Sequence, residues 1–101
     1  MITAKQVAKL AQICAEINRK PTKRDVAGDK PTVLFNFFGH TTDVLVDVHL
    51  HGWSAGIKPD YSYIFFNAIG WRKKTPDDCW GKRSTFGQVV HDLQKLKERS
   101  K

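Results

Sequence analysis

Asp43-Val44-Leu45-Val46-Asp47-Val48-His49-Leu50-His51 is the stretch that decides the fold. Its even-numbered residues are all apolar, and its odd-numbered residues are mostly polar. Because successive side chains of a strand point to opposite faces of a sheet, this alternation predicts a half-buried strand. The even face is expected to enter a core, and the odd face to carry Asp43, Leu45, Asp47, His49 and His51.

Two more strands are expected on either side of this one. Residues 33–38 are β-prone and apolar on both faces, which predicts a strand covered on both sides or central in a sheet. The polar residues 39–42 are consistent with a hairpin connection. A third strand is expected over residues 61–69, ending at Gly70. It places Tyr61, Tyr63 and Phe65 on one face, which we expect a helix or a partner subunit to cover.

Helices are expected at both ends of the chain. Thr3 and Gln6 have the spacing of a capping box, and Thr85 and Gln88 repeat it. An apolar stripe at helical spacing follows each box, while residues 71–84 are expected to form a long loop. The predicted fold class is therefore α+β, in one domain of residues 1–101: a three-stranded antiparallel sheet with N- and C-terminal helices, α-β-β-β-α.

This order of elements is similar to that of double-stranded-RNA-binding domains. The similarity is one of topology only, because the lysine-rich start of that family's second helix is replaced here by Ser84-Thr85-Phe86-Gly87-Gln88. It would imply recognition of an RNA duplex by its shape, through basic helix ends. An order of elements does not establish a function, so no family is assigned from it.

The formal net charge of +7 is unevenly distributed along the chain. Residues 1–30 carry seven basic against three acidic side chains, and residues 71–101 carry nine against four. The middle of the chain has one lysine against three aspartates, so the expected sheet is slightly acidic. This distribution favours an anionic partner approached by the terminal thirds of the chain. The alternative is that these cations only keep a small protein in solution.

The expected loop over residues 71–84 is the sharpest candidate site. It interleaves two indole rings with five cations, which suits phosphate contacts combined with base stacking or a protein anchor. The alternative is that the two tryptophans cap the core edge and the cations are solvated. Basic residues near the first helix and two tyrosines complete the candidate binding set: Trp71, Arg72, Lys73, Lys74, Trp80, Lys82, Arg83, Lys20, Lys23, Arg24, Tyr61 and Tyr63.

Catalytic and metal chemistry find little support in the sequence. His49 and His51 would face the same side of a strand, but Asp47 would lie too far along it to join them on one ion. Cys79 follows two aspartates, which oppose formation of a thiolate. No glycine-rich phosphate loop or nucleophile elbow is present. We therefore expect no cofactor and no metal, and a metal-dependent enzyme at His49 and His51 stays a third hypothesis.

Two functional hypotheses follow. The first is a small, basic, non-catalytic binding protein that acts on nucleic acid or on a nucleic-acid-handling complex. The second is a phage or mobile-element inhibitor that docks on a host protein complex, with tryptophans and the aromatic face as anchors and cations for steering. A homodimer through the aromatic sheet face is a further expectation. The sequence has no signal-peptide pattern and no apolar run of membrane-spanning length, so a cytoplasmic location without membrane partners is expected.

Overall fold

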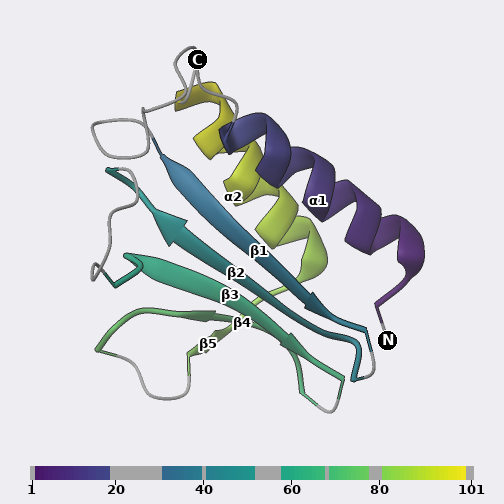
Figure 1. Ribbon diagram of the computed structural model, residues 1–101. Coiled ribbons are helices and arrows are strands. Elements are labelled where there is room, and N and C mark those ends of the chain that lie inside the picture. Colours follow the sequence, from purple (N-terminus) through teal and green to yellow (C-terminus); the bar gives the residue numbers. More distant parts are fainter. Residues whose placement is uncertain are drawn as a thin grey trace.

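A meander of five strands underlies two helices in the computed structural model, which describes residues 2–18, 31–39, 41–51, 58–67, 69–77 and 81–99. The elements are α1 (Ala4–Asn18), β1 (Thr32–Phe38), β2 (Asp43–His49), β3 (Tyr61–Phe66), β4 (Gly70–Lys74), β5 (Lys82–Arg83) and α2 (Phe86–Arg99). The sheet is antiparallel, with the strands in sequence order. Both helices lie against the same face of it (Figure 1), and we call the opposite face the open face.

The fold class is confirmed as α+β with terminal helices, but the prediction of three strands was wrong. Gly70 does not end the sheet. The Ile69 amide donates to the Phe66 carbonyl at 3.1 Å, and Gly70 has a φ of +79°, a conformation that other residues rarely adopt. The chain therefore reverses here and pairs Phe65 with Trp71. The start of the expected loop over residues 71–84 is consequently strand β4, and part of its end is β5.

The core lies between the helices and the even-numbered face of β2. Val44, Val46 and Val48 are almost fully buried, as the alternation predicts. They pair across the sheet with apolar and aromatic residues of β1 and β3, including Val33 and Tyr63. The helices contribute their apolar stripes to the same core: Leu10, Ile13, Cys14 and Ile17 from α1, and Val89, Val90, Leu93 and Leu96 from α2.

The predicted starts of both helices are also observed. The Thr3 amide donates to Gln6 Oε1 at 3.0 Å, and the Gln6 amide donates to Thr3 Oγ1 at 3.2 Å, which completes a capping box. At α2 only half of the box forms. The Gln88 amide donates to Thr85 Oγ1, while the Gln88 side chain donates to Asp92 instead.

The expectation that residues 33–38 form a strand covered on both sides or central in a sheet was wrong, because β1 is an edge strand with one exposed face. Val33, on its face toward the helices, is fully buried, but Leu34 and Phe38 on the open face are 39% and 46% exposed. Apolar side chains on both faces of a strand predict burial on both faces only if something covers the second face. No helix or strand of the described residues covers these two side chains, which makes the open face the surface of interest.

Candidate nucleic-acid interface

Strand β4 divides the predicted cation cluster between two surfaces. Arg72 and Lys74 alternate with Trp71 and Lys73, and Arg72 pairs with Arg83 of β5. Arg72, Lys74 and Arg83 therefore lie on the open face, whereas Lys73 and Lys82 lie on the face toward the helices. Strand geometry thus separates five cations that the sequence presents as one group.

Lys73 has a structural role on the helix-covered face. Its Nζ lies 4.5 Å from the centroid of the Tyr61 ring and 5.8 Å from that of Tyr63. At these distances the ammonium group is attracted by the negative face of each ring. The two rings also meet edge to face, with centroids 5.6 Å apart. Lys73 is therefore held in place by β3 and is not free to extend toward a ligand.

Tyr63 and Trp71, predicted as binding residues, are buried. Tyr63 is fully buried, and its hydroxyl donates to Asp92 Oδ2 of α2 at 2.8 Å. Burial, followed by this hydrogen bond, raises the pKa of Tyr63 well above its usual value. Trp71 packs against Phe65 and Phe86. A helix thus covers the aromatic face, and the sheet surface available to a second copy or another partner is the open face.

Other predicted binding residues fall outside the described part of the chain, and the structure says nothing of them: Lys20, Lys23, Arg24 and Trp80. The same holds for Cys79, which was considered as a nucleophile.

The open face carries an exposed apolar patch that the sequence analysis missed. Phe38 ends β1 and Phe66 ends β3, and the rings are 46% and 42% exposed. Register places both residues at the same end of the open face, separated by Asp43 of β2. Leu34, Leu45 and Ile64 extend the surface toward the middle of the sheet. We call these five residues the apolar patch. Their signal in the sequence was the second apolar face of residues 33–38.

The Asn67 side chain links the turn after β3 to the turn after β1, at the end of the sheet where Phe38 and Phe66 lie. Asn67 Nδ2 donates to the carbonyl oxygen of Thr41 at 3.0 Å and also contacts Thr42 Oγ1. Thr41 and Asn67 belong to the turns that follow Phe38 and Phe66, respectively. The two hairpin turns are therefore linked directly to each other, and the residues that precede them have a defined backbone separation.

A line of cations lies beside the apolar patch. Arg83 and Arg72 are paired neighbours on the open face, and Lys74 follows Arg72 two residues along β4. Arg72 is anchored, since its Nη1 donates to the Gly81 carbonyl at 3.3 Å. Lys58 precedes β3 and lines a hollow together with Lys74. We call Arg83, Arg72, Lys74 and Lys58 the basic stripe.

Two acidic side chains of the open face lie on β2, which β3 separates from β4. Asp43 and Asp47 both belong to β2. Asp47 is engaged, because Ser62 Oγ donates to its Oδ1 at 2.6 Å. The open face is therefore graded in charge, with carboxylates on β2 and cations on β4 and β5. An anionic chain would be attracted to the β4–β5 side.

His49, half of the predicted pair with His51, is only 2% exposed. Its Nδ1 and the Oγ1 of the paired residue Thr32 are buried without a hydrogen-bond partner among the described residues. Within the same residues, no group of three or more His, Cys, Asp or Glu side chains is arranged to hold a metal ion. The structure therefore adds no ligand set to the hypothesis of a metal-dependent enzyme.

Searches against protein-family models, curated proteins and solved structures find no match to this chain. In the described part of the molecule, neither helix has the length and apolar character needed to cross a membrane. Functional inference therefore depends on the open face, where the apolar patch and the basic stripe lie side by side on adjacent strands.

Proposed function

We propose that this protein is a small binding module that holds single-stranded nucleic acid on the open face of its sheet. The observation that carries the proposal is the pair of exposed rings, Phe38 and Phe66, on the same face as the basic stripe. Aromatic side chains on an antiparallel sheet stack on bases, and neighbouring cations contact the phosphates. The exposed rings would supply the stacking, and the basic stripe would supply the contacts with phosphate groups.

A single strand fits this surface better than a duplex. Stacking on Phe38 or Phe66 needs bases that are unpaired and splayed out, which single strands offer. Recognition of an RNA duplex by its shape would instead use helix ends, and both helices lie against the face opposite the exposed rings. The duplex-binding mode implied by the order of elements is therefore less well supported than binding of a single strand.

The charges of the open face account for the expected strength and salt dependence of binding. Cations that neutralise phosphates release condensed counterions, with a slope in log K against log salt of about −0.7 per phosphate on a single strand. A stripe of four cations thus predicts a slope of at most about −3. Stacking adds about 1–3 kcal/mol per base and depends little on salt.

The test compares two adjacent phenylalanines of β1 that face opposite ways. Phe38 is on the open face, while Phe37 is 42% exposed on the other. Phe38→Ala or Phe66→Ala is expected to weaken binding of a labelled oligothymidylate by about 5- to 150-fold, measured by fluorescence anisotropy. Phe37→Ala is the matched control and should leave the affinity close to that of the wild type. Equal losses in Phe37→Ala and Phe38→Ala would contradict the proposal.

A protein partner is the second candidate, favoured by the aliphatic members of the apolar patch. Leu34, Leu45 and Ile64 offer no π-face to a base, and apolar patches rimmed by charge are typical of protein interfaces. This is the surface that an inhibitor of a host complex would use. Purification from lysate with and without nuclease separates the candidates. A protein that co-purifies after nuclease treatment, and no longer does so with Leu34→Ala, favours the protein partner. Nucleic acid that co-purifies and is removed by nuclease favours the nucleic-acid-binding module.

A further inference from the structure

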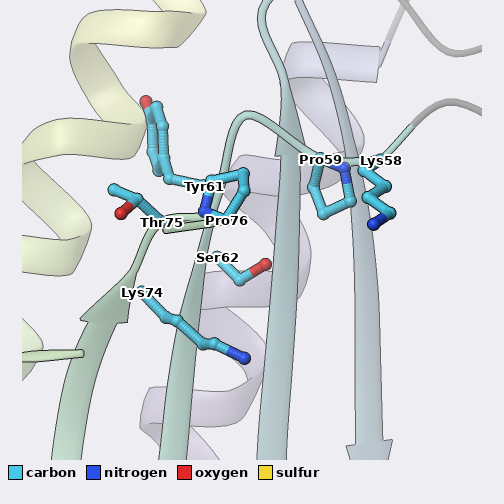
Figure 2. Close-up of a pocket in the computed structure, with 7 residues that line it drawn as sticks. All are labelled: Lys58, Pro59, Tyr61, Ser62, Lys74, Thr75 and Pro76. Atoms are coloured by element: carbon cyan, nitrogen blue, oxygen red, sulfur yellow. The ribbon is translucent and has the colours of Figure 1, made fainter. Parts of the chain in front are cut away.

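A hollow of about 250 Å³ lies at the end of the open face opposite Phe38 and Phe66, where β3 begins and β4 ends. Its lining combines two lysines, two prolines, an aromatic residue and two hydroxyl residues: Lys58, Pro59, Tyr61, Ser62, Lys74, Thr75 and Pro76. Figure 2 shows these side chains around the ends of the two strands. Lys58 and Lys74 belong to the basic stripe and Tyr61 packs against the core, but the proposed function assigns no ligand group to the hollow between them.

Two lysines, Lys58 and Lys74, are in the lining of this hollow. Lys74 pairs directly with Ser62, so both side chains lie on the open face. In Figure 2 the Lys74 side chain crosses β3 and ends below Ser62, Lys58 lies apart from it beside Pro59, and Tyr61 points away. Neither Lys58 nor Lys74 forms an ion pair with the described residues. Each ammonium group therefore keeps donors for a ligand.

Asp47 and Asp60, which lie next to lining residues, each accept a hydrogen bond within the protein, and Asp77 directly follows the lining residue Pro76. Asp47 accepts the Ser62 hydroxyl at 2.6 Å, and Asp60 accepts the Leu50 amide through Oδ2 at 2.7 Å. These hydrogen bonds hold both carboxylates toward backbone or side-chain donors of the protein. Pro59 and Pro76, whose rings restrict the backbone, form walls of the hollow. The result is a concave site whose lining includes two lysines.

We propose that this hollow binds a phosphate group of the nucleic-acid strand held on the open face. The inference rests on the proposed function and assigns one subsite of it. Two lysine ammonium groups suit the charge and the acceptor oxygens of a phosphate. Phe66 and Ser62 are four residues apart on β3, which corresponds to about 13 Å along a strand. A short oligonucleotide can therefore stack on the Phe66 ring and place a phosphate between Lys58 and Lys74.

The test measures how each lysine affects binding of an oligothymidylate of about eight nucleotides, with and without a terminal phosphate. Lys58→Ala and Lys74→Ala are each expected to weaken binding about 3- to 10-fold at low salt. Each should also make the slope in log K against log salt shallower by about 0.7. Lys95→Ala, which removes an exposed cation on α2, is the charge-matched control and should change both quantities less.

The two oligonucleotides distinguish the source of the phosphate. If the lysine variants lose affinity only for the phosphorylated oligonucleotide, the hollow binds a terminal phosphate. Equal losses for both oligonucleotides indicate a phosphate within the strand. Either result supports the subsite. If Lys58→Ala and Lys74→Ala behave like Lys95→Ala while Phe38→Ala still weakens binding, the subsite is refuted and the proposed function stands.

A separate measurement covers the case in which the wild-type protein binds no oligonucleotide. That result would refute the proposed function, and titration with inorganic phosphate, followed by amide chemical shifts, then tests the hollow alone. Saturable shifts at Ser62 and Lys74 that are absent in Lys58→Ala would support a phosphate site. No shift at these amides would overturn it.

Discussion

At the scale of single residues, the Tyr63 hydroxyl joins the sheet to α2. It donates to Asp92 Oδ2, and Gln88 Nε2 donates to Oδ1 of the same carboxylate at 2.9 Å. The Asp92 carboxylate thus receives one bond from a strand and one from its own helix. Hydrogen bonds to a charged group contribute more than neutral ones, about 1.5–3 kcal/mol each. Tyr63 is therefore expected to matter for stability and not for binding.

Tyr63→Phe tests this assignment. The variant keeps the ring and its contact with Tyr61 but removes the donor to Asp92. We expect the free energy of unfolding to fall by about 1–3 kcal/mol, measured by urea denaturation. Affinity for an oligonucleotide should stay within about twofold of the wild type, because Tyr63 faces the helix. A loss of affinity with unchanged stability would show that Tyr63 contributes to binding and would contradict this assignment.

At the scale of elements, the last residue of α1 shields part of the sheet edge. Asn18 Nδ2 donates to the Val33 carbonyl at 2.7 Å, and Asn18 Oδ1 accepts the Val33 amide at 2.8 Å. This is the pattern of bonds that a neighbouring strand would offer to β1. Edge strands with unpaired backbone groups are prone to pair with other chains, so such a cover protects the edge.

Asn18→Ala is expected to remove both bonds and leave two partly buried backbone groups unpaired. The free energy of unfolding should fall by about 2–4 kcal/mol, more than for a surface substitution. Gln12→Ala, an exposed substitution on the same helix, serves as the control and should change it by less than about 0.5 kcal/mol. Thermal denaturation of the three proteins provides the measurement. Similar stabilities for both variants would show that the Asn18 bonds do not contribute.

Elements whose signals are local were predicted from the sequence, whereas those that depend on pairing were not. The capping box of α1 and the alternation of residues 43–49 depend on near neighbours, and both predictions are confirmed, whereas Leu50 and His51 lie in a turn beyond the strand. β4 was missed because three consecutive cations, Arg72, Lys73 and Lys74, hide its alternation. Only pairing with β3 shows that the middle one is covered by aromatic rings while the others face outward.

The candidate site was predicted only in part for the same reason. Arg72, Lys74 and Arg83 were selected from their charge, and all three lie on the open face. Phe38 and Phe66 were assigned to strands without a role, because their exposure depends on which face the helices cover. Which face of the sheet is covered depends on how α1 and α2 pack, and the spacing of the strand residues does not predict it.

At the scale of the whole molecule, two buried ionisable groups, the Cys14 thiol and the Tyr63 hydroxyl, make the stability of the fold sensitive to high pH. Burial raises the pKa of the Cys14 thiol from 9.0 to about 12, and the pKa of Tyr63 is raised above 10.0. Both groups are neutral in the folded state at pH values where they ionise in the unfolded chain. The unfolded state then binds fewer protons than the folded state, so stability decreases as pH rises.

The free energy of unfolding is expected to be insensitive to these two groups below about pH 9. Above pH 9 Cys14 should lower it by about 1.4 kcal/mol per pH unit, and Tyr63 should add a similar slope above pH 10. Urea denaturation across this range measures the slope. Cys14→Ala lowers overall stability through a cavity but should flatten the slope between pH 9 and pH 10. An unchanged slope in Cys14→Ala would contradict the assignment.

The bond from Asn67 to the turn after β1 has a consequence for recognition. It connects Asn67, which follows Phe66, to Thr41, in the turn after Phe38, and so links the two strand ends that carry the exposed rings. Association then costs little loop entropy and requires mainly that the two side chains select a rotamer. If the proposed function holds, this link between the two turns lowers the entropic cost of binding at Phe38 and Phe66.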